Sequence, residues 1–231
     1  LIMEQNNLAN LRHTLAHLLA QAVIEHYPNT QLTLGPAVDN GFYYDMDFQS
    51  TKITDADLEK IEVSMRKNLP NWTEFTHKTV SIDEAKQVFA GNPYKIELIE
   101  EIAERGEEIT LYTSGGFTDL CRGGHCEHPN TDIPSDCFKL DRIAGAYWRG
   151  NENNKMLTRV YGLAFENKDL LDAYIVQQAE AEKRDHRKIG TQMKLFTLSP
   201  LIGSGLPLLQ PNGMVIRAEL EKYLWELHKN R

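Results

Sequence analysis

The sequence lacks several features that would place it in a membrane or outside the cell. No run approaches the ~18 apolar residues that a membrane-spanning helix needs, and no basic segment followed by an apolar one begins the chain. It has only three cysteines, an odd number and too few for a secreted disulfide framework. We therefore expect a cytoplasmic protein without a membrane partner, whose cysteines are free thiols or metal ligands.

Positive charge is also scarce. Lys and Arg number 25 against 33 Asp and Glu, which gives a net charge of -8 at pH 7. Because neutralising phosphates requires clustered cations, this balance argues against indiscriminate nucleic-acid binding, while a local basic face stays compatible with it. The 231 residues, 41% of them hydrophobic, allow a sizeable core. Since one domain has roughly 100–200 residues, we expect one full domain and part of a second.

Hydrophobic spacing and turn residues predict an α+β fold with a largely antiparallel sheet. Helices are expected over residues 8–27, 54–69, from 81, 93–106, 168–189 and 215–228. Strands are expected over residues 31–34, 42–48, 72–80, 109–113, 137–140 and 156–165. Glycine-rich loops are expected between the later strands.

Two pairs of side chains with ligand chemistry share a four-residue spacing. His13 and His17 lie one turn apart on the first helix, so their imidazoles share a face. Cys121 and His125 repeat the spacing in a glycine-rich loop, where the backbone can approach a ligand closely. Brought together, the four would form a compact cluster able to bind a metal. The alternative is a histidine pair that is only part of the surface or core.

A second segment combines aromatic and basic residues. Tyr147, Trp148 and Arg149 lie within the glycine-framed loop expected at residues 145–150, and Lys155 follows. Aromatic rings beside cations suit stacking on nucleotides and contact with phosphate. The alternative is a packed turn whose Tyr and Trp belong to the core.

Five motifs, taken together, resemble bacterial threonyl-tRNA synthetases in order and spacing. They are the His-x-x-x-His pair, the Gly-Phe-Tyr-Tyr-Asp hairpin at 41–45, Asp119-x-Cys121-Arg122-Gly123-x-His125, the segment 145–150, and Arg-Asp-His-Arg-Lys-Ile-Gly at 184–190. Editing domains of alanyl-tRNA synthetases share the two His and Cys pairs, so only the ordered set is specific. The resemblance implies an editing domain over residues 1–165, a linker helix over 166–190 and the start of a truncated class II catalytic domain over 191–231.

The resemblance also implies an activity, the hydrolysis of serine wrongly attached to tRNA(Thr). Serine lacks one methyl of threonine, and one methylene is worth only about 1–3 kcal/mol of discrimination, so a second, hydrolytic site is needed. The expected partner is the acceptor end of tRNA(Thr) carrying serine. ATP, Mg and a further Zn are expected only in the absent part of the catalytic domain, so we do not expect this chain to make aminoacyl-tRNA. The parent is expected to be a homodimer and this chain a monomer.

The expected site combines residues indicated by their spacing with residues indicated by the resemblance. His13 and His17 are the acid-base and water-positioning candidates, and Cys121 and His125 are expected to complete the pocket wall. By the resemblance, Lys95 stabilises the developing oxyanion, Asp119 holds the substrate ammonium and Tyr44 takes the matching aromatic position. From the residues alone, the alternative is that Lys95 is a snorkelling lysine and Tyr44 a core tyrosine. The residues expected to contact tRNA are Arg122, Tyr147, Trp148, Arg149 and Lys155.

The cluster leaves a choice between a metal site and a metal-free one. His13, His17, Cys121 and His125 could bind zinc tetrahedrally, and the resemblance associates zinc with the alanine-type relatives. A closed four-ligand site would leave no position for water, and the threonine-type site is implied to act without metal. We therefore favour metal-free hydrolysis and keep zinc as the alternative. The rival functions are an alanyl-tRNA-type editing deacylase and a non-catalytic RNA-binding module stabilised by zinc.

Overall fold

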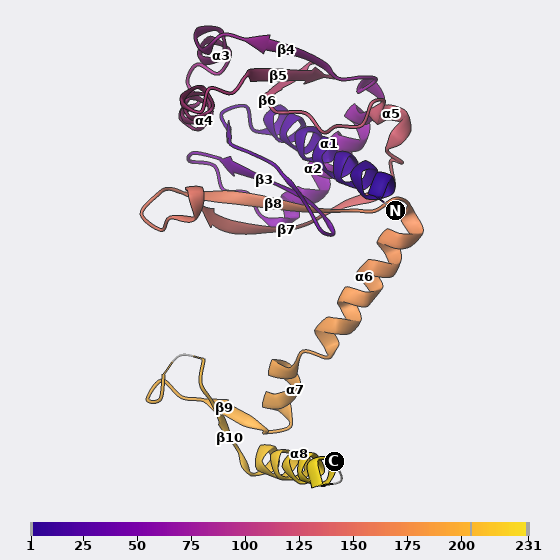
Figure 1. The fold of residues 1–231 in the computed structure, drawn as a ribbon, viewed down its shortest axis with the longest axis vertical. Coiled ribbons are helices and arrows are strands. Elements are labelled where there is room, and N and C mark those ends of the chain that lie inside the picture. The colour runs from indigo at the N-terminus through magenta and orange to yellow at the C-terminus, as the bar shows by residue number, and fades with distance from the viewer. Residues whose placement is uncertain (1, 204, 230–231) are drawn as a thin grey trace. The chain divides into compact units, whose positions relative to one another are not determined.

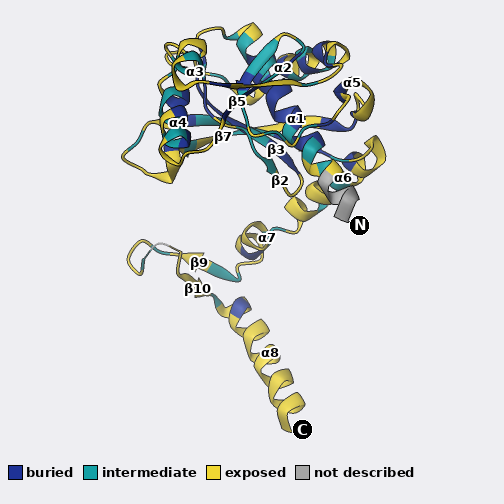
Figure 2. Cartoon of the chain, turned by 45° about the horizontal axis from the view of Figure 1, so that its top comes forward, coloured by how far each residue is buried: buried dark blue, intermediate teal, exposed yellow. Residues whose placement is uncertain are grey.

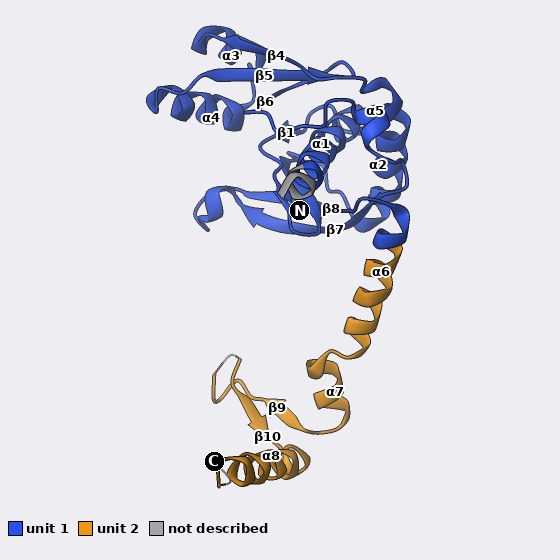
Figure 3. Cartoon of the chain, turned by 45° about the vertical axis from the view of Figure 1, so that its right-hand side comes forward, with its two compact units in different colours: residues 1–171 blue, residues 172–231 orange. Residues whose placement is uncertain are grey.

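The computed structural model describes residues 2–203 and 205–229 (Figure 1). The chain divides into two compact units, residues 1–171 and 172–231 (Figure 3). The first unit contains α1 (Ile2–His26), β1 (Gln31–Leu32), β2 (Ala37–Val38), β3 (Gly41–Asp47), α2 (Asp55–Asn68), the 3-10 turn η1 (Leu69–Asn71), β4 (Thr76–Val80), α3 (Ile82–Val88), α4 (Pro93–Glu104), β5 (Ile109–Ser114), β6 (Phe117–Leu120), α5 (Pro129–Asp132), β7 (Phe138–Tyr147), the 3-10 turn η2 (Trp148–Gly150) and β8 (Met156–Ala164). The predicted domain bounds at residues 165 and 190 remain a prediction.

The first unit holds two antiparallel sheets. The larger has the order β1-β3-β8-β7, with β2 also paired to β3, and the smaller has the order β4-β5-β6. Each pairing in both sheets is antiparallel. The predicted α+β class with a largely antiparallel sheet is therefore confirmed.

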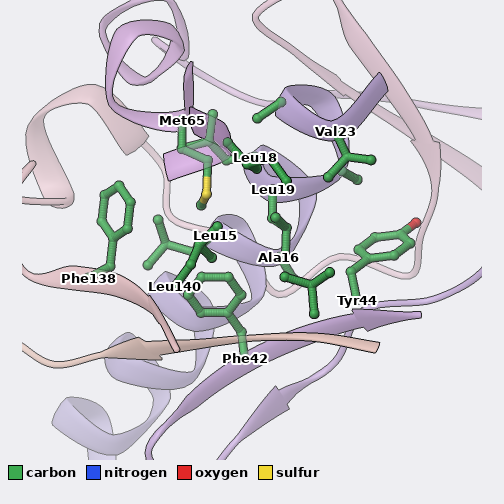
Figure 4. Close-up of a cluster of buried hydrophobic side chains, with 14 of the residues drawn as sticks. Leu15, Ala16, Leu18, Leu19, Val23, Phe42, Tyr44, Met65, Phe138 and Leu140 are labelled. Carbon is green, nitrogen blue, oxygen red and sulfur yellow. The ribbon is translucent and has the colours of Figure 1, made fainter. Parts of the chain in front are cut away.

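Helix α1 lies between the two sheets (Figure 1). From Leu11 to Val23 nearly every side chain is buried or half-buried, as expected for a helix packed on more than one side. Figure 4 shows its apolar side chains against those of β3, α2 and β7, with these residues labelled: Leu15, Ala16, Leu18, Leu19, Val23, Phe42, Tyr44, Met65, Phe138 and Leu140. The helix predicted over residues 8–27 is present and begins earlier, at Ile2. Its central position carries His13 and His17 into the interior.

Strand β6 was not predicted, although the sequence contains its signal. Gly115 and Gly116 join β5 to β6 with φ values of 56° and 80°. A two-residue hairpin turn that needs positive φ at both central residues favours two glycines, because they carry no Cβ. The turn pairs Asp119 with Tyr112, and the Cys121 amide donates to the Thr110 carbonyl at 3.2 Å. The hairpin thus fixes the backbone on which two site residues stand.

The glycine-framed loop predicted over residues 145–150 is wrong for its first half. Strand β7 continues to Tyr147, well beyond the predicted end at residue 140, because β8 pairs with it as far as Tyr147 opposite Met156. Only Trp148 to Gly150 leaves the sheet, as η2, and Arg149 there has a φ of 58°. The aromatic and basic residues therefore form the tip of a long hairpin.

The second unit contains the rest of α6 (Lys168–Lys183), then α7 (His186–Gln192), β9 (Phe196–Leu198), β10 (Pro207–Leu209) and α8 (Pro211–Lys229). The single helix predicted over 168–189 is wrong, because Asp185 accepts a hydrogen bond from the Arg187 amide and starts α7. β9 and β10 pair antiparallel. Helix α8 is mostly exposed, its apolar residues included (Figure 2). Among the helices that the structure describes, none combines the length and apolar character needed to cross a membrane.

Candidate functional site

Helix α1 and the loop after β6 bring the two predicted ligand pairs together. One ligand atom from each of His13, His17, Cys121 and His125 lies within 4.8 Å of the other three. His13 Nε2 is 3.2 Å from His17 Nε2 and 3.5 Å from Cys121 Sγ. His125 Nε2 is 3.3 Å from the same sulfur. We call these four residues the His-Cys cluster.

The outer ring nitrogens of the two α1 histidines are held by acceptors. His13 Nδ1 is 3.1 Å from the Gly124 carbonyl, which can only accept, so this nitrogen carries a proton and donates it. His17 Nδ1 is 3.0 Å from Asp119 Oδ2. Both imidazoles therefore point their Nε2 atoms at the cluster, and the hydrogen bonds fix their ring orientations.

His125 differs from the two α1 histidines in its packing. Its ring is stacked against Phe75 at a centroid distance of 4.0 Å and against His13 at 4.5 Å. It lines the hollow beside Asn10 and Leu11, and the lining of the cavity at His13 and Cys121 does not include it, so its place in the pocket wall stays a prediction. Gly123 and Gly124, both with positive φ, turn the chain between Cys121 and His125, and this turn brings His125 Nε2 to the thiol sulfur. Its Nδ1 is buried and has no partner among the described residues.

Asp119 joins the cluster to a second group of buried polar residues. Its Oδ2 accepts a hydrogen bond from the Tyr44 hydroxyl at 2.6 Å as well as from His17. Its Oδ1 pairs with the Lys95 ammonium, and both side chains are only 2% exposed. Lys95 also donates to the Tyr44 hydroxyl at 3.2 Å. We call Tyr44, Lys95 and Asp119 the buried triad, in which Lys95 is an ion-pair partner and not a snorkelling lysine.

Helix α4 delivers Lys95 to the triad. Asn92 caps the helix by accepting from the Tyr94 and Lys95 amides, and Pro93 occupies its first turn, where no amide proton is needed. The Asn92 amide group also donates to the Leu32 carbonyl at 2.8 Å. The start of α4, and with it Lys95, is thus tied to the chain that leads into β3.

The electrostatics favour charged groups in the cluster and triad. Burial alone would lower the pKa of His17, but hydrogen bonds to Asp119 and Cys121 raise it to about 9. Burial would raise the pKa of Cys121, but its hydrogen bonds with His125, His13 and His17 lower it to about 3. Burial would likewise raise the pKa of Asp119, yet Lys95 and His17 hold it well below its ordinary range. The favoured state of these three groups is an imidazolium, a thiolate and a carboxylate.

The cluster and the triad share one cavity. It has a volume of about 310 Å³, and its lining includes His13, His17 and Cys121 from the cluster and all three triad residues. Leu98 and Ile102 of α4 line it as well. Sequence reasoning missed these two and Phe75, because their roles depend on packing between elements. The apolar i, i+4 spacing of Leu98 and Ile102 was the available signal.

Two of the residues predicted to contact tRNA are tied to α4. Trp148 is buried, and its indole N–H donates to Glu97 Oε2 at 3.0 Å. Arg149 pairs with Glu97 at 2.6 Å and with Glu101 at 2.5 Å. The indole therefore belongs to a packed turn, and both cationic and aromatic groups have partners within the chain. Their contact with tRNA remains a prediction.

The other three predicted tRNA contacts are more exposed. Tyr147 is 41% exposed at the end of β7. Lys155 pairs with Asp47 at 2.6 Å, and Arg122 pairs with Glu107 at 2.5 Å. Arg122 also lines the cavity, so it is the member of this set that lies beside the cluster.

The donor set of the cluster fits a metal ion such as zinc. Three of the six separations among its ligand atoms, at 3.2 to 3.5 Å, suit the edges of a tetrahedron around an ion bound at about 2.0–2.3 Å, and all six are within 4.8 Å. The outer nitrogens of His13 and His17 are also held by a carbonyl and a carboxylate, as ligating histidines usually are. The four residues can therefore hold a metal, with three imidazoles and a thiolate as ligands.

An α+β domain that gathers two histidines, a thiolate and a buried lysine around one cavity, with a third histidine beside the thiolate, defines a candidate hydrolytic or metal-binding protein. No protein-family model matches the chain. The chain is 48% identical over 222 residues to the threonine–tRNA ligase of Thermotoga maritima, which covers 95% of this chain and 34% of that protein. It is 48% identical over 214 residues to the threonine–tRNA ligase of Staphylococcus aureus strain JH9, covering 93% and 32%. The chain corresponds to a segment of a threonyl-tRNA synthetase, and it spans about a third of the length of these relatives.

Proposed function

We propose that this segment edits tRNA by hydrolysing serine from mischarged tRNA(Thr). The observation that carries the proposal is the single cavity on which the His-Cys cluster and the buried triad meet. The relatives are ligases by name, and a ligase that must separate serine from threonine needs a second, hydrolytic site. We assign residues 1–165 to the editing domain, 166–190 to a linker helix and 191–231 to the start of a class II catalytic domain. The proposed partner is the acceptor end of tRNA(Thr).

The proposed reaction uses His13 as the base. Its Nδ1 proton is held by Gly124, so Nε2 of the neutral ring carries the lone pair. That lone pair faces His17 Nε2 and Cys121 Sγ in the structure, and we propose that a water in the cavity takes the place of these contacts. Nε2 takes a proton from the water, and the hydroxide bonds to the ester carbonyl carbon. The bond from that carbon to the ribose oxygen then breaks, and the oxygen receives a proton from the His17 imidazolium. The products are serine and tRNA with a free hydroxyl.

The triad supports this reaction by binding charge. Lys95 provides a buried ammonium that can stabilise the oxyanion as it forms. Asp119 provides a carboxylate for the serine ammonium, and Tyr44 holds that carboxylate through its hydroxyl. We propose that the threonine ester is rejected because its extra methyl crowds the cavity, which reverses the size preference of a synthetic site.

Zinc is the alternative chemistry at the cluster. His13, His17, Cys121 and His125 would hold it, and a catalytic zinc lowers the pKa of a bound water toward neutrality. A set of four protein ligands closes the tetrahedron and leaves no coordination position for that water. We therefore propose that the chain's own residues carry out hydrolysis without metal.

Deacylation of defined substrates tests the proposal. We expect the chain to release serine from tRNA(Thr) and to leave threonine on the same tRNA. Release of serine from tRNA(Ala) in preference to tRNA(Thr) would favour the alanyl-tRNA-type deacylase instead. Binding of tRNA(Thr) without hydrolysis of either ester would favour the non-catalytic RNA-binding module.

A further inference from the structure

The tip of the β7-β8 hairpin holds α4 through a compact set of contacts. The Arg149 guanidinium bridges Glu97 and Glu101, which stand one turn apart on the helix. The Trp148 indole donates to the other oxygen of Glu97, and the Arg149 guanidinium lies 5.0 Å from its ring centroid. Trp148 also packs edge-on against Tyr94 at the start of α4, with ring centroids 5.3 Å apart. We call these contacts the α4 clamp.

The clamp is connected to β3 as well. The Tyr94 hydroxyl donates to Asp47 at 2.8 Å, and Lys155 of the same hairpin pairs with that carboxylate at 2.6 Å. Asp47 ends β3, the strand that carries Tyr44. The hairpin tip therefore joins α4 to the strand on the other side of the cavity.

The opposite face of α4 forms the cavity wall. Lys95, Leu98 and Ile102 line the cavity, at positions three and four residues apart that share a helix face. Leu98 connects the two faces of the helix, because it lines the cavity and also packs against the apolar group of Tyr94, Trp148 and Leu157. A movement of the clamp residues would therefore displace Leu98 and change the cavity wall.

The backbone at the clamp is also unusual. Arg149 has a φ of 58°, in the left-handed region that a residue with a Cβ seldom adopts. Such a conformation persists only where the surrounding contacts hold it. Here the two ion pairs with α4 supply those contacts, which indicates that the turn is built to hold the helix.

We propose that Trp148 and Arg149 are positioning residues that fix α4 and thereby set how large an amino acid the cavity admits. The inference rests on the proposed editing function. A firmly held α4 keeps Lys95, Leu98 and the triad close together, so serine fits and the methyl of threonine does not. A released α4 lets the wall move, and the larger ester enters.

The test compares hydrolysis of serine and threonine from tRNA(Thr) by the full chain and by Arg149→Gly. Glycine removes both ion pairs and accepts the positive φ, so the change does not strain the backbone. Arg142→Ala is the matched control, because Arg142 lies on β7 and pairs with the neighbouring Asp141. The paired exchange of Arg149→Glu with Glu101→Arg serves as the rescue. Circular dichroism verifies that each variant is folded.

For Arg149→Gly, we expect the ratio of kcat/KM for serine over threonine to fall by about tenfold, because one methylene is worth roughly 10–200-fold. The control should keep the wild-type ratio, and the exchange should recover part of it. An equal loss for both substrates, in KM alone, would mean that Arg149 only contacts tRNA and would overturn the proposal. So would an unchanged ratio in a folded variant. A wild-type chain that releases neither amino acid would instead overturn the editing function, and this inference with it.

Discussion

The buried triad and three residues of the His-Cys cluster line the same cavity, but the two groups hold their polar atoms in different ways. In the triad, the Lys95 and Asp119 side chains are only 2% exposed, and each charge has a partner of opposite sign. In the cluster, His13 and Cys121 are half-buried, and the nitrogens and sulfur face one another at 3.2 to 3.5 Å. Neighbouring atoms that can each gain or lose a proton suit proton transfer, whereas a closed set of ion pairs suits fixed positioning.

This difference assigns separate tasks to the two groups. His17 connects them, because its Nδ1 faces Asp119 and its Nε2 faces His13. Through it the triad holds an imidazolium in place for the cluster. Changes in the cluster should therefore reduce activity and spare the fold, and changes in the triad should affect both.

His13→Ala should have the largest effect on activity. Loss of an acid-base group lowers a rate by about 10²–10⁴-fold, so release of serine from tRNA(Thr) should fall in that range. The free energy of unfolding should change little, because His13 is half-buried. Single-turnover deacylation and denaturant unfolding measure the two quantities. The control is His186→Ala, whose side chain is 87% exposed in the second unit. Undiminished hydrolysis by His13→Ala would remove His13 from the mechanism.

Asp119→Ala should destabilise the fold and also inactivate the chain. It leaves the Lys95 ammonium and the His17 imidazolium buried without their counterion, which costs about 3–5 kcal/mol. Denaturant unfolding followed by circular dichroism measures the loss. Asp141→Ala is the matched control, because it breaks an exposed pair with Arg142 worth at most about 1 kcal/mol. Equal stabilities for the two variants would show that the triad does not act as a closed charge network.

The three cysteines should separate by reactivity. Burial raises the pKa of Cys126 to about 11 and that of Cys137 to about 12, whereas the pKa of Cys121 is lowered to about 3. Above its pKa a thiol is a thiolate, so the alkylation rate of Cys121 should stay level between about pH 5 and pH 8, where an ordinary thiol gains about tenfold per unit. Mass spectrometry after brief treatment with iodoacetamide identifies the modified residue. Earlier modification of Cys126 or Cys137, or a steep rise for Cys121, would contradict this electrostatic account.

Removal of metal should have the smallest effect. The proposed mechanism uses only side chains, so a chelator should leave the release of serine unchanged. The metal content is measured on protein purified without chelator or immobilised nickel. A tightly held zinc, whose removal abolishes hydrolysis, would show that the cluster works as a metal centre.

The sequence predicted the cluster better than the triad, for physical reasons. Four-residue spacing on a helix and in a glycine-rich loop is a local property, so His13, His17, Cys121 and His125 could be selected from the residues alone. The burial of Lys95 depends on its contacts with Tyr44 of β3 and Asp119 of β6, which lie far from it in the chain. No local pattern records these contacts, and only the resemblance to a family indicated Lys95. The same holds for the partners of Trp148 and Arg149, because Glu97 and Glu101 lie far from them in the chain.

Most of the predicted elements are present. The errors occur where long-range strand pairing or a helix cap determines where an element ends. Strand β7 extends to Tyr147 because β8 pairs with it, and the helix predicted over residues 168–189 divides because Asp185 caps a new turn. The missed strand β6 had a local signal in Gly115 and Gly116. Two adjacent glycines between extended segments predict a hairpin better than they predict a loop.

The most direct test of the editing function is the release of amino acid from tRNA(Thr) charged with serine and, separately, with threonine. The chain is used at a concentration above that of tRNA, so that a single turnover is observed. We predict rapid release of serine and release of threonine no faster than without protein. Release of both at the same rate, or of neither, would contradict the account of a cavity that selects and hydrolyses the smaller ester.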